Sequence, residues 1–170
     1  MGRLALFSTM IMLLLRCLSG VMIQASDVSA LMAFKRGISR DIHNILGSWD
    51  PSLATPLGWF HVTCDAAGRV IRLDLSNEGL VGTIAPELAE LDELQFLELK
   101  GNFLVGHIPP VLGNLLNLVS LDFSHNFLSG PIPLGFDNFI RGKLKFLRLE
   151  VNSLTGPISW NLGFVPLYVL

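Results

Sequence analysis

A sequence pattern that returns every 24 to 26 residues constrains this chain more than any other feature. The pattern starts at Val70, Leu94, Leu118 and Leu144, which gives spacings of 24, 24 and 26 residues. Leucine or phenylalanine stands three and five positions after each start, leucine ten, glycine twelve and isoleucine fourteen positions after it. A single unit of this size cannot bury its own apolar residues, so at least three must stack around a shared core.

The opening residues of each unit alternate between apolar and polar side chains, which predicts a short strand with one face turned inward. Asn102, Asn126 and Asn152 stand eight positions after their starts, and Glu78 interrupts this series in the first unit. A buried asparagine at that place can hydrogen-bond the turn backbone of its own unit and of the neighbouring one. We therefore expect a structural ladder of asparagines along the stack.

The N-terminal 25 residues are typical of a secretion signal. Arg3 precedes an almost unbroken apolar run of 12 residues from Leu4 to Leu15, followed by Arg16. A membrane-spanning helix needs roughly 20 such residues, so the run is short for a span. We predict a signal peptide over residues 1–25 with cleavage after Ala25, although an uncleaved anchor stays open. The mature chain then has no membrane span, and its expected location is extracellular, in the apoplast or at the cell surface.

Charge narrows the choice of partners. The chain has 12 basic and 14 acidic residues, and the predicted signal removes two arginines and no acid, which leaves 10 basic and 14 acidic residues, a net charge of −4. Nucleic-acid binding needs a basic face, so we expect no nucleic-acid partner.

Several segments resemble plant leucine-rich-repeat proteins. Two are the repeat motifs Gly-His-Ile-Pro at 106–109 and Gly-Pro-Ile-Pro at 130–133. Three others look like the N-terminal cap of that family: residues 30–35, 46–51 and 59–64, the last reading Trp-Phe-His-Val-Thr-Cys. The chain is most similar to the ectodomains of somatic embryogenesis receptor-like kinases and to the short secreted repeat proteins related to them. The resemblance implies an α/β solenoid, a right-handed leucine-rich-repeat coil with a short parallel β-sheet on the concave face and a helical N-terminal cap.

The predicted domains follow from this organisation. The cap covers residues 26–69, and four repeats cover 70–93, 94–117, 118–143 and 144–166 before a fifth begins and stops at residue 170. In the cap, Ser26 and Asp27 are good helix N-caps, and apolar residues near one helical face can close the open end of the first repeat. These apolar residues are Val28, Leu31, Phe34 and Ile38, joined by Ile42, Ile45, Leu46 and Trp49.

Two departures from the family pattern concern stability. Leu57 stands where the family cap has the cysteine that pairs with the position of Cys64, so Cys64 is unpaired. The missing disulfide is worth roughly 2.5 kcal/mol for so short a loop. Cys64 is then either a buried free thiol or the site of an intermolecular disulfide. No capping sequence follows the fourth repeat, and we expect a marginally stable or aggregation-prone monomer.

The expected partner-binding surface combines the concave face with the cap. Phe60 and His61 match a Phe-His pair that, in the resembling receptor kinases, helps to bracket a small hormone or peptide held by a larger receptor. Lys100 and Ser124 replace tyrosines that the same resemblance leads us to expect. The full set of predicted contact residues is Phe60, His61, Arg72, Asp74, Phe96, Glu98, Lys100, Asp122, Phe146 and Arg148, with Ser76, Ser120, Ser124 and Glu150 on the same strands.

No sequence pattern indicates catalysis. Gly142-Lys143 lacks the remainder of a nucleotide-binding loop, kinase signatures are absent, and the four histidines show no metal-ligand spacing. We expect neither a cofactor nor a metal, and predict a non-catalytic protein that binds a receptor-kinase ectodomain, or a peptide- or hormone-receptor complex, in plant signalling or defence. Two alternatives stay open: a truncated receptor-kinase ectodomain acting as a decoy or inactive fragment, and an inhibitor of a cell-wall-degrading enzyme.

Overall fold

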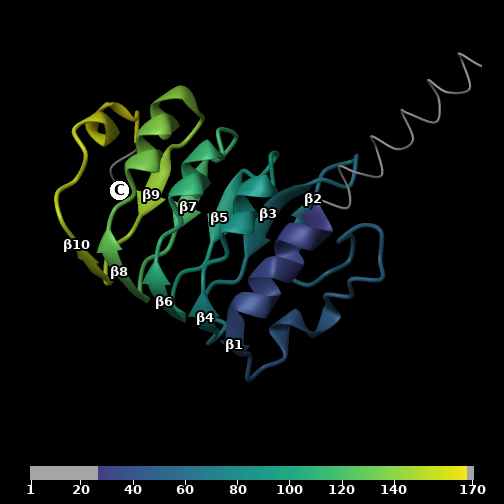
Figure 1. Ribbon diagram of the computed structural model, residues 1–170. Coiled ribbons are helices and arrows are strands. Elements are labelled where there is room, and N and C mark those ends of the chain that lie inside the picture. The colour runs from purple at the N-terminus through teal and green to yellow at the C-terminus, as the bar shows by residue number, and fades with distance from the viewer. Residues whose placement is uncertain (1–26, 168–170) are drawn as a thin grey trace, which may run out of the picture.

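The computed structural model describes residues 27–167. The predicted signal peptide and residues 168–170 of the predicted fifth repeat lie outside these described residues. Figure 1 shows a stack of coils that leads from the N-terminal helix to the last coil, with strands on two sides and short helices on a third. Each coil contributes one strand to an inner sheet, one to an outer sheet and one short helix between them.

The inner sheet confirms the parallel sheet predicted for the concave face. Its order is β2 (Val62–Cys64), β3 (Val70–Asp74), β5 (Phe96–Glu98), β7 (Ser120–Asp122) and β9 (Phe146–Arg148). The last four strands are parallel, with Leu73 opposite Leu97 and Leu97 opposite Leu121. The cap strand β2 runs antiparallel to β3. Equivalent residues of successive repeats are therefore neighbours across the sheet.

The outer sheet is a feature that the sequence analysis did not predict. Its order is β1 (Ile38–Arg40), β4 (Val81–Thr83), β6 (Phe103–His107), β8 (Phe127–Pro131) and β10 (Ser153–Thr155). Strands β4 to β10 are parallel, and β1 is antiparallel to β4. The close approach of β1 requires Gly82, because a Cβ there would collide with the Gly37 carbonyl oxygen.

The short helices complete each coil on the side that joins the two sheets. They are η1 (Ile45–Ser48) in the cap, then η2 (Pro86–Glu90), η3 (Pro110–Asn114), η4 (Leu134–Arg141) and η5 (Asn161–Phe164). The third repeat is two residues longer than the first two. The extra residues, near 137–143, lengthen η4, in which Phe139 packs in the core beside Phe136 with ring centroids 4.9 Å apart. Phe139 is the buried residue of this segment, whereas Ile140 and Arg141 beside it are exposed.

The N-terminal cap closes one end of the core, as expected. The helix covers residues 27–37, and Leu31, Phe34 and Trp49 are at most 1% exposed. Trp49 stacks on Trp59 with a centroid distance of 5.5 Å. The buried Asp27 carboxylate accepts a hydrogen bond from the Val70 amide at 2.8 Å, which joins the helix to the first repeat strand.

Two of the apolar cap residues that were predicted to close the open end of the first repeat have other roles. Ile38 lies in β1 rather than on the helix, because the chain leaves the helix at Gly37 to pair with β4. Ile42 is 57% exposed and does not cover the core. Trp59, by contrast, was not predicted to be in the core, but it is only 3% exposed and packs in the cap core.

Asparagine side chains connect successive coils through buried hydrogen bonds. The Asn102 Oδ1 accepts from the Leu80 amide at 2.9 Å, and its Nδ2 donates to the carbonyl of Leu75 at 2.7 Å. Asn126 repeats this pattern with the Leu104 amide and the Leu99 carbonyl, at 3.1 and 2.9 Å. Asn152 does so one coil later with Leu128 and Phe123, both at 2.9 Å, but is only half-buried. Each asparagine therefore satisfies backbone groups that neither sheet uses.

We predict that Asn126→Ala destabilises the protein by about 1–3 kcal/mol, because it leaves the buried Leu104 amide without its partner and removes one of the two side-chain donors to the Leu99 and Phe123 carbonyls, which keep Asn102 and Asn152 respectively. The measurement is urea unfolding followed by circular dichroism. The matched control is Asn114→Ala, a change at an exposed asparagine on η3, which should alter the free energy by less than about 0.5 kcal/mol. Equal effects of the two variants would contradict the role of the ladder.

Candidate functional site

The outward positions of the inner sheet form three columns that cross the coils. The first holds Arg72, Phe96, Ser120 and Phe146; the second holds Asp74, Glu98, Asp122 and Arg148; the third holds Ser76, Lys100, Ser124 and Glu150. Parallel pairing places the members of each of the first two columns on adjacent strands, so their side chains stand about 4.8 Å apart. Predicted contact residues that are far apart in sequence are in this way brought together on one face.

Two arginines lie against phenylalanine rings on this face. The guanidinium carbon of Arg72 is 3.9 Å from the centroid of the Phe96 ring, and that of Arg148 is 5.2 Å from the Phe146 ring. Both phenylalanines are half-buried. A cation held over an aromatic face is attracted by about 0.5–2 kcal/mol, which restricts the motion of both side chains. These pairs are preorganised elements of the kind that anchor protein interfaces.

The third coil differs from the exposed strip that we expected. Ser120 and Asp122 are 5% exposed and Ser124 is fully buried. The Asp122 carboxylate accepts hydrogen bonds from the Ser124 amide at 2.9 Å and from the Ser124 hydroxyl at 2.6 Å. The small residues of this coil are thus covered by the larger side chains of the neighbouring coils on the inner sheet. Asp122 therefore offers little surface to a partner.

Glu98 is the carboxylate most perturbed by this arrangement. Burial raises its pKa, and the charges of Asp122 and Asp74 raise the pKa further. A hydrogen bond from Ser120 and the charge of Arg148 oppose these effects. Glu98 lies between the two acids in the second column, so a cationic group from a partner would relieve a repulsion already present in the free protein.

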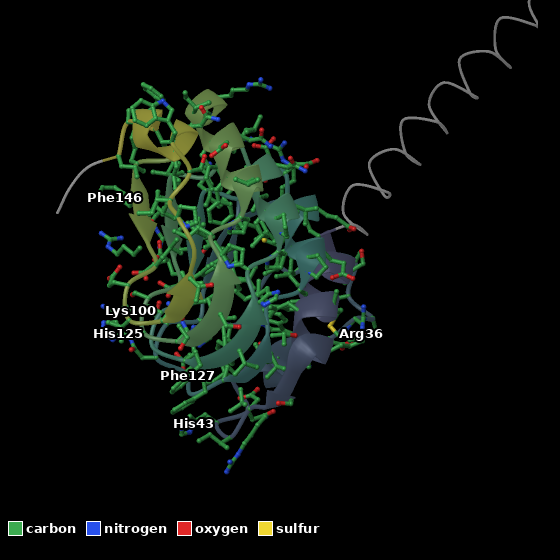
Figure 2. The ribbon with its side chains drawn as sticks, turned by 60° about the vertical axis from the view of Figure 1, so that its left-hand side comes forward. Arg36, His43, Lys100, His125, Phe127 and Phe146 are labelled. Atoms are coloured by element: carbon green, nitrogen blue, oxygen red, sulfur yellow. The ribbon has the colours of Figure 1, made fainter. Side chains whose placement is uncertain are left out.

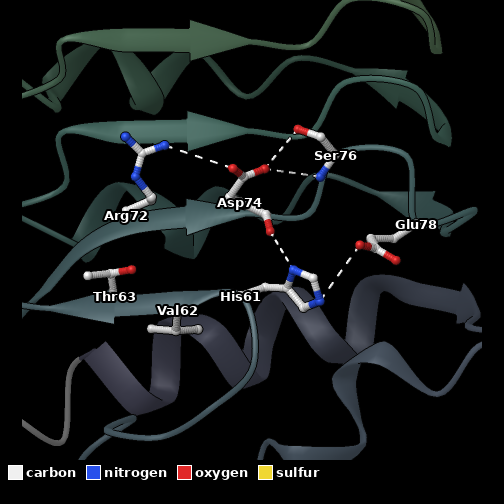
Figure 3. A pocket seen from close by; sticks show the side chains of 7 residues that line it. All are labelled: His61, Val62, Thr63, Arg72, Asp74, Ser76 and Glu78. Atoms are coloured by element: carbon white, nitrogen blue, oxygen red, sulfur yellow. Dashed lines mark hydrogen bonds and ion pairs between the residues drawn. The ribbon is translucent and has the colours of Figure 1, made fainter.

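A hollow of about 440 Å³ lies where the cap meets the first repeat. It is lined by His61, Val62 and Thr63 of the cap and by Arg72, Asp74, Ser76 and Glu78 of the first coil. Figure 3 shows the His61 ring between the two parts, with Nδ1 2.9 Å from the Asp74 carbonyl oxygen and Nε2 3.7 Å from a Glu78 carboxylate oxygen. The imidazole therefore fixes the edge of the hollow. Val62, Thr63 and Glu78 were not predicted as site residues, although Glu78 is the residue that interrupts the asparagine series.

The cap loop also carries Phe60, which precedes His61 in the sequence and is exposed. Its side chain is 67% exposed, whereas its backbone is fixed at both ends: the amide donates to the Ser48 hydroxyl at 2.9 Å and the carbonyl accepts from the Trp49 indole at 3.1 Å. His61 follows with a φ of 67°, a left-handed conformation that turns the chain back into β2. A large exposed aromatic on a fixed backbone loses little entropy when it is covered by a partner.

Cys64 is partly buried at the end of β2, next to the cap core. Burial and the charges of Asp27 and Asp65 raise its pKa to about 11. The thiol is therefore protonated near neutral pH and is a poor nucleophile.

The remaining polar side chains of the described part of the chain do not form a metal site. Within residues 27–167, no group of three or more histidine, cysteine or acidic side chains could hold a metal ion. Lys100 is exposed at the edge of the inner sheet, and Figure 2 shows it and Phe146 on the same side of the molecule. The arrangement is suited to contact with another molecule through charge and aromatic surface.

Comparison with known families identifies both parts of the chain. Residues 24–65 match the leucine rich repeat N-terminal domain, and residues 93–115 and 117–139 match the leucine rich repeat. Leucine-rich repeat protein 1 of Oryza sativa subsp. indica is 54% identical over 74 residues, which cover 44% of this chain. The corresponding protein of Arabidopsis thaliana is 50% identical over the same length. These matches span 34% of the length of each relative.

Solved structures agree with this result. A chain of the BIR3–SERK2 complex from Arabidopsis thaliana superposes with a TM-score of 0.74 at 32% identity, over 85% of this chain and 80% of that one. This chain belongs to the plant leucine-rich-repeat proteins with an N-terminal cap. The leucine-rich-repeat ectodomain of the Arabidopsis receptor kinase SOBIR1 matches with a TM-score of 0.68 at 30% identity and 77% coverage of that ectodomain. A chain of the PEPR1–AtPEP1 structure matches with a TM-score of 0.77 at 35% identity, but only 20% of it is covered.

These relationships connect the chain with plant leucine-rich-repeat proteins and with the ectodomains of receptor kinases. Its relatives are repeat proteins and ectodomains of this kind rather than enzymes. Among the described residues, no helix has both the length and the apolar character needed to cross a membrane.

We predict that Glu98→Gln increases the free energy of unfolding at pH 7. A carboxyl with a higher pKa in the folded than in the unfolded chain is destabilising when ionised, so removing its charge removes that cost. The gain should shrink as the pH falls through the raised pKa and vanish below the ordinary value of 4.5. Urea unfolding at several pH values measures it.

The matched control for this series is Glu87→Gln, a change at an exposed acid on η2. At every pH, the free energy of unfolding of this control variant should differ little from that of the parent protein. A Glu98→Gln variant that is less stable than the parent at pH 7 would contradict the environment described for Glu98.

Proposed function

We propose that this chain is a secreted, non-catalytic leucine-rich-repeat protein that binds receptor-kinase ectodomains at the plant cell surface. The cap loop and the inner sheet together would form the binding surface, in signalling or defence. Secretion rests on the predicted signal peptide, and the absence of catalysis rests on the lack of any catalytic pattern in the sequence.

The observation that carries this proposal is the arrangement of fixed aromatic and arginine side chains along one face. Phe60 stands on a loop whose backbone is held by Ser48 and Trp49, and the Arg72–Phe96 pair lies on the neighbouring first two coils. Exposed aromatics and arginines on a rigid backbone are the residues that contribute most to protein interfaces. The hollow is lined both by Arg72 of this pair and by His61, the residue that follows Phe60.

The similar structures support the same kind of partner. One of them is the BIR3–SERK2 complex, and another is the structure of PEPR1 with AtPEP1. Ectodomains of this fold thus form complexes with proteins and peptides. The two alternatives are a receptor-kinase fragment that acts as a decoy or is inactive, and an inhibitor of a cell-wall-degrading enzyme.

The test is biolayer interferometry of the full secreted chain against Arabidopsis ectodomains of BIR3, SERK2, SOBIR1 and PEPR1. We expect saturable binding to at least one at micromolar concentration or below. The double variant Phe60→Ala/Phe96→Ala should weaken it at least tenfold, which corresponds to about 1.4 kcal/mol lost at two anchors. The control is Leu134→Ala on η4, which truncates a 75% exposed residue outside the inner sheet and should bind like the parent.

Three outcomes would overturn the proposal. Absence of saturable binding up to about 100 µM would favour an inactive fragment. Equal loss of binding in the Leu134 control would place the contact elsewhere. Inhibition of a secreted polygalacturonase, without binding to the ectodomains, would replace the proposal by the inhibitor alternative.

A further inference from the structure

The outer sheet carries a row of exposed apolar side chains that neither the fold nor the proposed binding surface uses. The row, here called the aromatic column, consists of Ile42, Phe103 and Phe127, which are 57%, 51% and 56% exposed. The two phenylalanine rings stack with centroids 6.0 Å apart and an angle of 11° between their planes. In Figure 2, Phe127 lies with His43 at the lower margin of the molecule, away from Phe146.

Cap and repeats contribute to the same row. Phe103 and Phe127 stand nine positions after their repeat starts, and the first repeat has Gly79 at this place. A Cβ on Gly79 would lie 3.9 Å from both the Ile42 Cδ1 atom and the His43 ring. Ile42 and His43 of the cap loop therefore occupy the space over Gly79, where the first coil has no side chain. As a result, the aromatic column continues across three coils.

The framework of the coil does not require phenylalanine here. The equivalent positions of the first and fourth repeats hold Gly79 and Ser153, and both coils form their outer strands. The adjacent inward residues Leu80, Leu104 and Leu128 are fully buried and supply the core. Contiguous apolar side chains that are exposed without a structural need mark interaction surfaces.

Arg40 is the one side chain on the five strands of the outer sheet that carries a formal charge at pH 7. The five strands of the outer sheet contain no aspartate or glutamate, whereas Arg40 lies on β1 and His107 on β6. Arg40 pairs with Val81 across the sheet, and Val81 in turn pairs with Phe103. Asp41, the acid nearest to Arg40 in sequence, accepts hydrogen bonds from the amides of Ile45 and Leu46, both at 2.9 Å.

The basic side chains at the rim of the column are available to a partner. Arg40, His43 and His107 are exposed, and none of them forms an ion pair with another of residues 27–167. Glu78, close to the same turn, is engaged with His61 at 3.7 Å. An apolar row with a free basic rim is complementary to apolar side chains that are flanked by carboxylates.

We propose that the outer sheet is a second interaction surface, which binds an acidic segment of a partner protein through two or three large apolar side chains. The column spans roughly 10 Å across three coils at the usual strand spacing. Val105 on β6, which is 44% exposed and pairs with Phe127, is the one further exposed large apolar residue beside it on these strands. Polar residues border it at Thr83, Ser129 and Ser153. These dimensions fit a single peptide segment better than a lipid bilayer, which needs a broad apolar face.

The test uses two synthetic fluorescent peptides with the same spacing of leucine and phenylalanine, one with glutamate and the other with lysine between them. Anisotropy titration with the full secreted chain should show binding of the glutamate peptide with a Kd below about 1 mM and at least tenfold weaker binding of the lysine peptide. The variant Phe103→Ser/Phe127→Ser should reduce binding of the glutamate peptide at least tenfold. The control Leu134→Ser, at an exposed apolar residue of η4, should leave it unchanged.

A second variant keeps the test decisive if the serine substitutions disturb folding. Arg40→Glu/His107→Glu leaves the aromatic column intact and should reverse the preference toward the lysine peptide. Equal affinity for both peptides, no change in either variant, or no binding of the glutamate peptide at 1 mM would overturn the proposal. Preferential sedimentation with phosphatidylcholine–phosphatidylserine vesicles, lost in the serine variant, would overturn it in favour of a lipid surface.

Discussion

The structure depends on hydrogen-bond partners for the buried backbone amides and carbonyls at the turn of each repeat. A chain that turns between two parallel sheets leaves amides and carbonyls at the turn that no strand can pair, and these groups lie inside the core. Asn102, Asn126 and Asn152 satisfy them, each by accepting from an amide of the preceding coil and donating to a carbonyl of that coil. Because unpaired buried groups cost about 1–3 kcal/mol each, this ladder fixes both the distance and the register between coils.

Fixed register has consequences on both surfaces of the stack. On the inner sheet it places the Arg72–Phe96 pair beside the cap hollow and brings Glu98 between two other acids. On the outer sheet the same register aligns Phe103 with Phe127 into a stacked pair. The two surfaces differ in charge and do not share residues, so one partner on each side is compatible with the geometry. The short helices between them supply the core with Leu88, Leu112 and Phe136.

Repetition is the reason why the fold could be predicted from the sequence. The recurring leucines define the buried positions of each coil without reference to long-range contacts, and the solenoid and its parallel sheet follow from them. The outer sheet was not predicted, although its strands recur in each repeat. Features that do not repeat were also less predictable. The antiparallel strand β1, the exposed Ile42 and the burial of Trp59 depend on how the cap meets the first coil, which happens only once. The alternation of apolar and polar residues predicted outward positions for Ser120, Asp122 and Ser124. The larger side chains around them bury all three, and the alternating pattern carries no information on the size of these neighbours.

The central claim is that the asparagine ladder joins the coils into one cooperative unit. Native-state hydrogen exchange of the Leu80 and Leu104 amides, which donate to Asn102 and Asn126, tests it most directly. If the ladder joins the coils in this way, both amides exchange only through global unfolding, with a free energy equal to that of urea unfolding measured on the same protein. Exchange of either amide several orders of magnitude faster, at a free energy independent of urea, would show that the coils open separately and would contradict the account.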